Sequence, residues 1–324
     1  MSTQSMPSRP FRIQRSELAV PATSAHFFEK AAKGPADTIF FDLEDAVSPD
    51  RKAEARRATI DALNDIDWGR KTMAVRVNGL DTEWAHRDII DVASSCPRLD
   101  LIMLPKVGTA FDVQFTAALL TGIEKETGRS SRIGIELLIE TTLGLANVES
   151  IAASSDRLEA MIFGIGDYSI SLQTFETMIG ASNPDYAVLT DPDAKGVRSL
   201  HWNDHWHFAS ARISNACRAY GLRPIDGPYT NFGDPEGYKA AARRSRALGF
   251  EGKWAIHPSQ VPLANEVFNP SDVQIQWANE IIEEISKAQA TGRGAFALRG
   301  QLIDLAHLKL ARNILDRRDL LASN

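Results

Sequence analysis

Short apolar segments recur along the chain, separated by longer stretches of mixed polarity. Most of these segments are continuously apolar rather than alternating, which is the pattern of strands that are buried on both faces of a parallel sheet. Eight such strands are predicted, over residues 17–22, 38–45, 72–78, 99–106, 133–140, 160–167, 222–228 and 252–258.

The segments between the strands have the character of helices. Residues 50–64 are rich in Ala, Arg and Glu, which favour helices, and residues 112–126 place apolar side chains roughly on one face. Residues 235–248 and 272–290 look similar. Strands and helices that alternate in this way predict a (β/α)₈ TIM barrel, an α/β fold. A doubly wound open sheet is the alternative, and the number of strands favours the barrel.

Two regions depart from this alternation. Residues 170–206 contain many Gly, Pro, Asn and Asp residues and indicate a long loop or insertion after the sixth strand. Beyond the eighth strand, helical stretches at 259–290 and 301–320 are joined by a glycine-rich turn at 290–300. We therefore expect three parts: a disordered N-terminus over residues 1–14, a TIM barrel over 15–270, and a C-terminal helical extension over 271–324.

The composition of the 324-residue chain excludes several classes of function. Its formal net charge of −6 leaves no general basic surface for nucleic acid. Cys96 and Cys217 have no close Cys neighbours with which to form a zinc site or a disulfide framework. The chain shows neither a signal peptide nor an apolar run of roughly 18 residues. We expect a cytoplasmic protein without nucleic-acid or membrane partners.

Polar residues gather where the predicted strands end. In a TIM barrel, the active site lies at the C-terminal ends of the strands, so these side chains would meet at one rim. Several carboxylates at one rim must be paired with cations or bound to metal to avoid the cost of burial. The polar residues at strand ends are Asp42, Glu44, Asp45, Arg76, Asn78, Lys106, Glu140, Asp167, Asp226 and His257.

Glu140 and Asp167 are the best pair for a hard divalent cation, because each directly ends an apolar strand and the two strands are adjacent. Two carboxylates, completed by waters and substrate oxygens, are a common Mg²⁺ site. The alternative is that each carboxylate pairs with a basic residue such as Arg76 or Lys106. A buried Arg76 needs anions, so it either neutralises Glu44 or Asp45, or holds substrate, or does both.

Six motifs, in this order, closely resemble the HpcH/HpaI aldolase/citrate lyase β-subunit-like family: DTIFFDLEDAVSPDRKAEAR, VRVNGLDT, IMLPKVG, ELLIET, FGIGDY and KWAIHPSQV. The resemblance extends from about residue 15 to 320. Within the family, DIDWGRK, FGDPEGY, LANEVFNPS and GRGAFALRGQLIDLAH resemble the malyl-CoA lyase branch.

The resemblance implies a TIM barrel whose C-terminal extension acts as a lid over a neighbouring subunit's site, in a homo-oligomer such as a trimer or hexamer. It implies Mg²⁺, or Mn²⁺, and a coenzyme A thioester as substrate. By position, it assigns Glu140 and Asp167 to the metal, Arg76 to the substrate, and Asp304 to the lid. It places Lys30 near the CoA phosphates and Ile256, His257 and Pro258 near the CoA adenine.

The activity implied by the resemblance is a Mg²⁺-dependent, reversible Claisen-type cleavage of L-malyl-CoA, and of β-methylmalyl-CoA, into glyoxylate and acetyl-CoA or propionyl-CoA. Arg76 would stabilise the enolate, Asp304 would protonate it, and Glu44 or Asp45 would orient Arg76. The alternatives are a malyl-CoA thioesterase, a citramalyl-CoA lyase, or a citrate lyase β-type subunit.

Two positions depart from the family pattern. Ser24 stands where relatives often carry an Arg near the CoA phosphate. Ile170 stands where relatives have a small residue. We expect Ile170 to narrow the pocket beside the metal, which would favour malyl-CoA over citramalyl-CoA.

Overall fold

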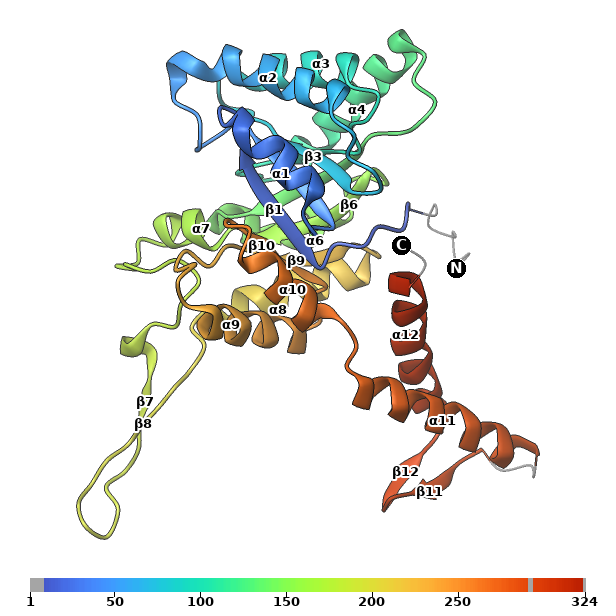
Figure 1. Ribbon diagram of the computed structural model, residues 1–324. Coiled ribbons are helices and arrows are strands. Elements are labelled where there is room, and N and C mark those ends of the chain that lie inside the picture. The colour runs from blue at the N-terminus through green and yellow to red at the C-terminus, as the bar shows by residue number, and fades with distance from the viewer. Residues whose placement is uncertain (1–8, 291–293, 323–324) are drawn as a thin grey trace. The chain divides into compact units, whose positions relative to one another are not determined.

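The computed structural model describes residues 9–290 and 294–322. The chain forms two compact units, Met1–Val267 and Phe268–Asn324. The first unit contains a closed barrel of parallel strands, which confirms the predicted fold (Figure 1). No helix in the described part of the chain is long and apolar enough to cross a membrane.

The barrel closes through the pairing of its first and last strands, which excludes the open sheet. Ser16 of the first strand lies opposite Lys253 of the last. The strands follow each other around the barrel in the order β1-β10-β9-β6-β5-β4-β3-β2. Their bounds are Ser16–Pro21 (β1), Thr38–Asp42 (β2), Thr72–Arg76 (β3), Leu101–Leu104 (β4), Gly134–Ile139 (β5), Leu158–Phe163 (β6), Arg223–Asp226 (β9) and Gly252–Ala255 (β10).

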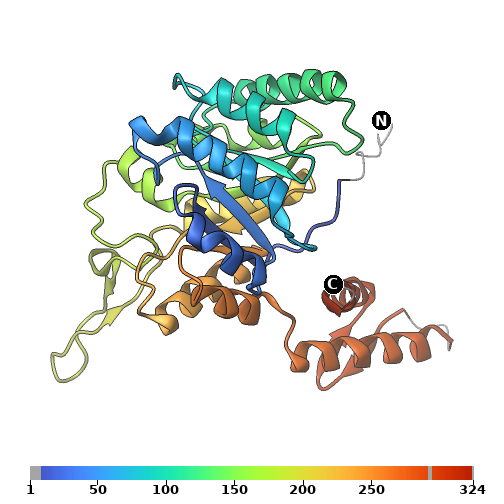
Figure 2. The same ribbon diagram turned by 45° about the horizontal axis from the view of Figure 1, so that its top comes forward.

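Helices cover the outside of the barrel, and Figure 2 shows α2, α3 and α4 side by side over its strands. Local signals set the helix ends: the N-cap of α4 is Thr109, whose side chain forms a capping box with Asp112, and its C-cap is Gly128 in a left-handed conformation. The helices of this unit are Phe28–Lys33 (α1), Lys52–Asp65 (α2), Ala85–Ser95 (α3), Ala110–Thr127 (α4), Thr142–Ala146 (α5), Val148–Ala152 (α6), Ile165–Ser171 (α7), His207–Ala219 (α8), Pro235–Ala247 (α9) and Gln260–Phe268 (α10), with 3₁₀ turns at Ala25–Phe27, Pro49–Arg51 and Pro184–Tyr186.

The insertion after the sixth barrel strand is partly ordered into a hairpin. Strands Val188–Leu189 (β7) and Leu200–His201 (β8) pair antiparallel and extend away from the barrel (Figure 1). At the base of the insertion, His205 Nε2 lies 3.2 Å from Glu176 Oε1. This contact ties the two ends of the insertion together.

The second unit is built from two helices and a hairpin, Asp272–Ala290 (α11), Phe296–Leu298 (β11), Gln301–Ile303 (β12) and Leu305–Ala322 (α12). Its core includes Ala278, Ile281, Ile285, Ile303 and Ala311. The predicted helical stretch 259–290 is two helices, since Pro270 follows the end of α10 and cannot continue a helix. The stretch 301–320 begins with a strand because Arg299 and Gly300 adopt positive φ angles and turn the chain into a hairpin. Part of the predicted turn, residues 291–293, lies outside the described residues.

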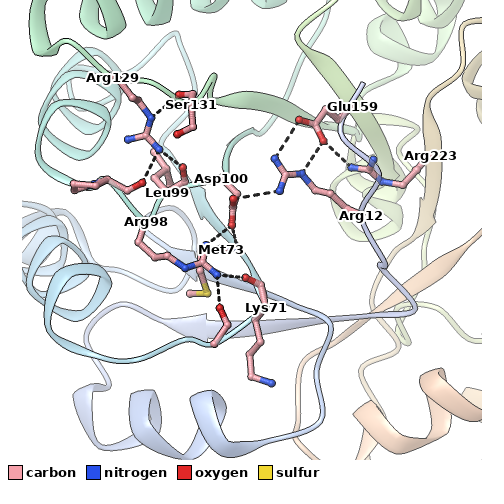
Figure 3. Close-up of polar contacts among 12 residues, drawn as sticks. Arg12, Lys71, Met73, Arg98, Leu99, Asp100, Arg129, Ser131, Glu159 and Arg223 are labelled. Atoms are coloured by element: carbon pink, nitrogen blue, oxygen red, sulfur yellow. Dashed lines mark hydrogen bonds and ion pairs between the residues drawn. The ribbon is translucent and has the colours of Figure 1, made fainter. Parts of the chain in front are cut away.

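The chain that precedes the barrel closes its N-terminal end. Residues 1–8 of the segment that we expected to be disordered lie outside the described residues, whereas Arg12 contacts the barrel. Arg12 Nη1 lies 3.2 Å from Asp100 Oδ1, and its Nε donates to Glu159 Oε2 over 2.8 Å (Figure 3). Glu159 also accepts a hydrogen bond from Arg223. These contacts link the N-terminal segment to three strand regions of the barrel.

The barrel interior contains a layer of apolar side chains, and two carboxyl groups lie next to it toward the N-terminal ends of the strands. Glu17 of β1 and Glu136 of β5 are both fully buried. The Gln14 amide donates to Glu17 Oε2 over 3.2 Å and to Glu136 Oε1 over 2.6 Å. The remaining oxygens, Glu17 Oε1 and Glu136 Oε2, face no N–H donor. One proton held by Glu17 and donated to Glu136 satisfies both oxygens.

This shared proton predicts a pH-dependent stability. Burial, followed by the negative charge of Glu136, raises the pKa of Glu17 well above its usual value. A raised acid pKa contributes stability that is fully present below the unfolded pKa and is lost as the pH rises through the folded pKa. We expect wild type to lose more unfolding free energy than Glu17→Gln between about pH 5 and about pH 8 in urea denaturation. Glu126→Gln, on the exposed face of α4, is the control. Equal pH dependence in wild type and Glu17→Gln would contradict the shared proton.

Candidate active site

The C-terminal rim of the barrel gathers the charged side chains that end β2, β3 and β5. Asp42 and Arg76 are register partners at the ends of β2 and β3. Along β5, Glu136 and Leu138 face the barrel interior, and alternation directs the next residue of this series, Glu140, to the same side at the rim. Asp42, Arg76 and Glu140 are all buried.

The Arg76 guanidinium is held by two carboxylates. Its Nε and Nη2 donate to Asp42 over 2.8 and 2.6 Å, and its Nη1 lies 2.9 Å from Glu44 Oε2. On one side the cation lies 5.5 Å from the centre of the Trp254 ring. These contacts take three of the five N–H groups of the guanidinium, so it keeps donors for a further oxygen.

Lys106 connects this ion pair to Glu140. Its Nζ donates to Glu44 Oε1 over 2.5 Å, while its backbone N–H donates to Glu140 Oε1 over 2.6 Å. Lys106 has a φ of 54°, a left-handed conformation that costs a residue with a side chain on the order of 1–3 kcal/mol. The two hydrogen bonds hold the residue in this conformation, so the loop after β4 fixes both carboxylates.

The charged groups at this rim shift the pKa values of its carboxyl groups in opposite directions. Burial, reinforced by Glu44 and Asp167 and opposed by Arg76, raises the pKa of Glu140 to about 8. Burial also opposes the ionisation of Asp42, but the charge and hydrogen bonds of Arg76 outweigh it and lower the Asp42 pKa. Around Glu140, the negative charge of the carboxylates therefore exceeds the positive charge of the nearby cations.

This excess of carboxylate oxygen fits a hard divalent cation such as Mg²⁺. Asp167 lies in the first turn of α7, directly after the β6 strand that neighbours the Glu140 strand. Gly164 lets the backbone between β6 and α7 pass close to Glu140, because a Cβ at this position would lie 2.4 Å from the Glu140 Cβ. No group of three His, Cys, Asp or Glu residues with metal-binding geometry occurs among the described residues. Glu140 and Asp167 would thus need oxygen ligands from substrate and water.

A second feature of the first unit is a cavity of about 480 Å³ beside β1 and α1. Its lining is mainly apolar and includes all four residues that the resemblance places near coenzyme A: Lys30, Ile256, His257 and Pro258. The His257 ring stacks on Phe232, with 4.8 Å between the ring centroids. The cavity therefore combines apolar walls with the ammonium group of Lys30.

Three predicted residues have other surroundings. Asp45 is half-exposed, and its carboxylate lies 3.8 Å from Arg76 Nη1, so it contacts this cation less closely than Glu44 does. Ile170 is 74% exposed and does not line the cavity beside β1 and α1. Asp304 belongs to the second unit, directly before α12.

Two residues at the rim were not assigned roles from the sequence. Asp42, rather than Glu44 or Asp45, forms the two-bond contact with Arg76. Lys106 anchors both Glu44 and Glu140. Both residues could be found from their position at a strand end. Which residues they contact, however, depends on the register between β2 and β3 for Asp42 and on the loop after β4 for Lys106. Asp226, another strand-end residue, pairs instead with the buried Lys253 over 2.6 Å.

Comparison with known proteins gives a consistent result. The chain is 45% identical over 324 residues to L-malyl-CoA/β-methylmalyl-CoA lyase of Cereibacter sphaeroides, which covers 100% of both proteins. It is 35% identical over 316 residues to (3S)-malyl-CoA thioesterase of the same species, covering 98% of this chain and 97% of the relative. Protein CitE of Mycobacterium tuberculosis, solved with magnesium, acetoacetate and coenzyme A, is 27% identical with a TM-score of 0.72, covering 94% of this chain and 98% of CitE.

The model of one protein family, described as HpcH/HpaI aldolase/citrate lyase, matches residues 15–258. This range contains all eight barrel strands and the charged rim. Together with full-length relatives at 45% identity, the match shows that the chain belongs to the HpcH/HpaI aldolase/citrate lyase family.

Proposed function

We propose that the protein is a Mg²⁺-dependent carbon–carbon lyase that reversibly cleaves L-malyl-CoA, and also β-methylmalyl-CoA, into glyoxylate and acetyl-CoA or propionyl-CoA. The observation that carries the proposal is the charged rim around Arg76, Glu140 and Asp167, in a chain that matches malyl-CoA lyases over its whole length. Mn²⁺ could replace Mg²⁺, because both prefer oxygen ligands.

The metal site in this proposal consists of Glu140 and Asp167. A bound divalent cation supplies Lewis-acid chemistry, stabilising negative charge on substrate oxygens. Glu140 is held for this role by the Lys106 N–H, and the space beside it is kept open by Gly164. CitE, a member of the same fold group with magnesium bound, supports the choice of cation.

Arg76 stabilises the negative charge that develops on the thioester oxygen as the carbon–carbon bond breaks. Its guanidinium is fixed by Asp42 and Glu44 before substrate arrives, so little reorganisation is needed during the reaction. Asp42 and Glu44 act as positioning residues, and Asp45 is a more distant neighbour.

Asp304 moves the proton at the α-carbon of the acetyl group. In cleavage, the substrate hydroxyl loses its proton to water as the carbon–carbon bond breaks, and protonated Asp304 donates a proton to the enolate carbon. In condensation, ionised Asp304 removes that proton, and the new alkoxide takes one up from water. The cavity beside Lys30 and His257 receives the coenzyme A moiety. Its apolar walls suit the less polar parts of this molecule, and the Lys30 ammonium suits its phosphates.

The enzyme acts in the cytoplasm as a homo-oligomer, a trimer or hexamer, in which the second unit serves as a lid for a neighbouring subunit. The exposed apolar side chains of the insertion, among them Phe175, Val188 and Leu200, support self-association. Light scattering coupled to size exclusion measures the mass in solution, and a monomer at micromolar concentration would contradict this part of the proposal.

The test of the proposed activity follows two products from malyl-CoA separately. A lyase forms glyoxylate without releasing free thiol, whereas a thioesterase releases free CoA thiol without glyoxylate. Citramalyl-CoA in a parallel assay, with pyruvate as product, measures preference for the larger substrate. No glyoxylate from malyl-CoA, with or without thiol release, would contradict the proposal, as would activity that requires an acyl carrier protein.

Removing one metal carboxylate should abolish metal binding and turnover together. We expect Asp167→Asn to lose Mn²⁺ binding, measured by electron paramagnetic resonance, and glyoxylate formation, because one remaining carboxylate cannot hold the cation tightly. Excess EDTA should likewise stop wild-type turnover, and Mg²⁺ should restore it. The control is Asp61→Asn on the exposed face of α2. Full Mn²⁺ binding by Asp167→Asn would refute its assignment as a ligand.

Arg76→Lys should lower kcat by roughly 100-fold or more, the loss typical for a removed oxyanion donor. A lysine keeps the charge but has one nitrogen, so it cannot make the planar two-bond contact with Asp42 and present further donors. Steady-state kinetics with malyl-CoA measure the change, with Arg132→Lys as the control because Arg132 forms an exposed ion pair with Asp156. A kcat near wild type would exclude this role for the guanidinium.

A further inference from the structure

The start of α12 holds Asp304 in a closely defined geometry. The Ala306 N–H donates to Asp304 Oδ1 over 2.9 Å, as at a helix N-cap. The ring nitrogen Nδ1 of His307 lies 2.9 Å from the same oxygen and 3.3 Å from the Asp304 backbone nitrogen. One imidazole nitrogen thus faces both an acceptor and a donor of the same aspartate.

The two contacts correspond to two states of the imidazole. With a proton on Nδ1, His307 donates to the Asp304 carboxylate. Without it, Nδ1 accepts from the Asp304 N–H. Only the first state holds the carboxylate, which is otherwise exposed at the surface of the second unit; in the second state the ring holds the backbone of the same residue.

We propose that His307 is a positioning residue for Asp304, holding its carboxylate in the orientation from which it exchanges the proton at the substrate α-carbon. This inference rests on the proposed function, in which Asp304 is the proton-transfer group. It adds a partner for that group, at a position that the family motifs left without a role.

The electrostatics of the site agree with this geometry. Within the second unit as described, the groups that act on the Asp304 carboxylate are His307 and the N–H groups of Ala306 and His307. The His307 hydrogen bond, followed by the Ala306 N–H, lowers the pKa of Asp304. A lowered pKa keeps Asp304 ionised, which is the form that removes a proton in the condensation direction.

A purely structural role would produce the same contacts. An aspartate at the N-cap with a polar partner three residues later is a capping arrangement, which stabilises a helix start by about 1 kcal/mol. Helix capping and positioning of Asp304 predict different effects of a substitution at His307. Loss of a cap lowers thermal stability, whereas loss of positioning lowers kcat through Asp304.

The experiment compares His307→Leu, which removes the ring nitrogen, with His307→Asn, whose side-chain amide can occupy the position of Nδ1. We expect His307→Leu to lower kcat for malyl-CoA cleavage about 10-fold or more with little change in KM, as for loss of a hydrogen bond to a charged group. His307→Asn should recover most of this loss. Lys309→Leu, exposed on the same helix, is the matched control for added apolar surface.

Two further measurements separate positioning from capping. In an Asp304→Asn background, which should itself lower kcat strongly, His307→Leu should cause no further loss, because its effect passes through the carboxylate. For condensation of acetyl-CoA with glyoxylate, the acid limb of the pH profile should move to higher pH in His307→Leu, because the Asp304 pKa rises when the hydrogen bond is lost.

The outcomes are distinguishable. If wild type does not cleave malyl-CoA, the proposed function and this inference both fall. If wild type does, and Asp304→Asn loses kcat while His307→Leu keeps it, only this inference is overturned. It is also overturned if His307→Leu loses activity in proportion to a fall in melting temperature with an unmoved pH profile, or if it costs as much again in the Asp304→Asn background.

Discussion

The buried guanidinium of Arg76 is the interaction on which the barrel rim depends. An unpaired charge at this depth would cost several kcal/mol, so the surrounding chain must supply anions with good geometry. Asp42 at the end of the neighbouring strand accepts two hydrogen bonds from the guanidinium, and Glu44 makes a third contact. Glu44 then needs a second cation, Lys106, whose backbone N–H in turn holds Glu140. One buried charge therefore determines the placement of residues on four consecutive strand ends.

The cost of burying carboxyl groups is offset in different ways at the two ends of the barrel. Toward the N-terminal end, Glu17 and Glu136 are closed off from solvent and meet an amide and an indole, so a shared proton satisfies them. At the C-terminal rim, Glu140 lies among other carboxylates with cations nearby. A proton at the closed end removes charge and favours packing. At the rim, the raised pKa of Glu140 indicates that its negative charge needs a further cation, which is the property that a cation-dependent reaction requires.

The sequence predicted the barrel because eight continuously apolar strands have few alternative arrangements, and it placed Arg76, Lys106 and Glu140 at strand ends that share one edge. Asp226 and His257 were placed there too, but they contact Lys253 and Phe232 instead. The sequence did not predict that Arg76 pairs with Asp42, since this depends on the register between β2 and β3. The left-handed Lys106 was equally hidden, because its conformation is imposed by contacts rather than by local preference. The glycines of 290–300 predicted a turn, but not the strands β11 and β12 that pair across it. The positions of Glu140 and Asp167 at adjacent strand ends indicated a metal pair but left pairing with Arg76 or Lys106 open, whereas the role of Asp304 came from family resemblance alone.

Arg76 in the first unit and Asp304 in the second, the two groups with proposed roles, are held by different physical means. Arg76 is oriented by burial, since desolvation strengthens its two hydrogen bonds to Asp42. Asp304 is exposed and lacks that help, so its orientation must come from short-range contacts within its own chain segment. The first turn of α12 supplies them, because helix N-termini carry free N–H groups that suit a carboxylate. An exposed carboxylate held in this way has little desolvation cost in this position and keeps its orientation, which agrees with the proposed proton transfer by Asp304.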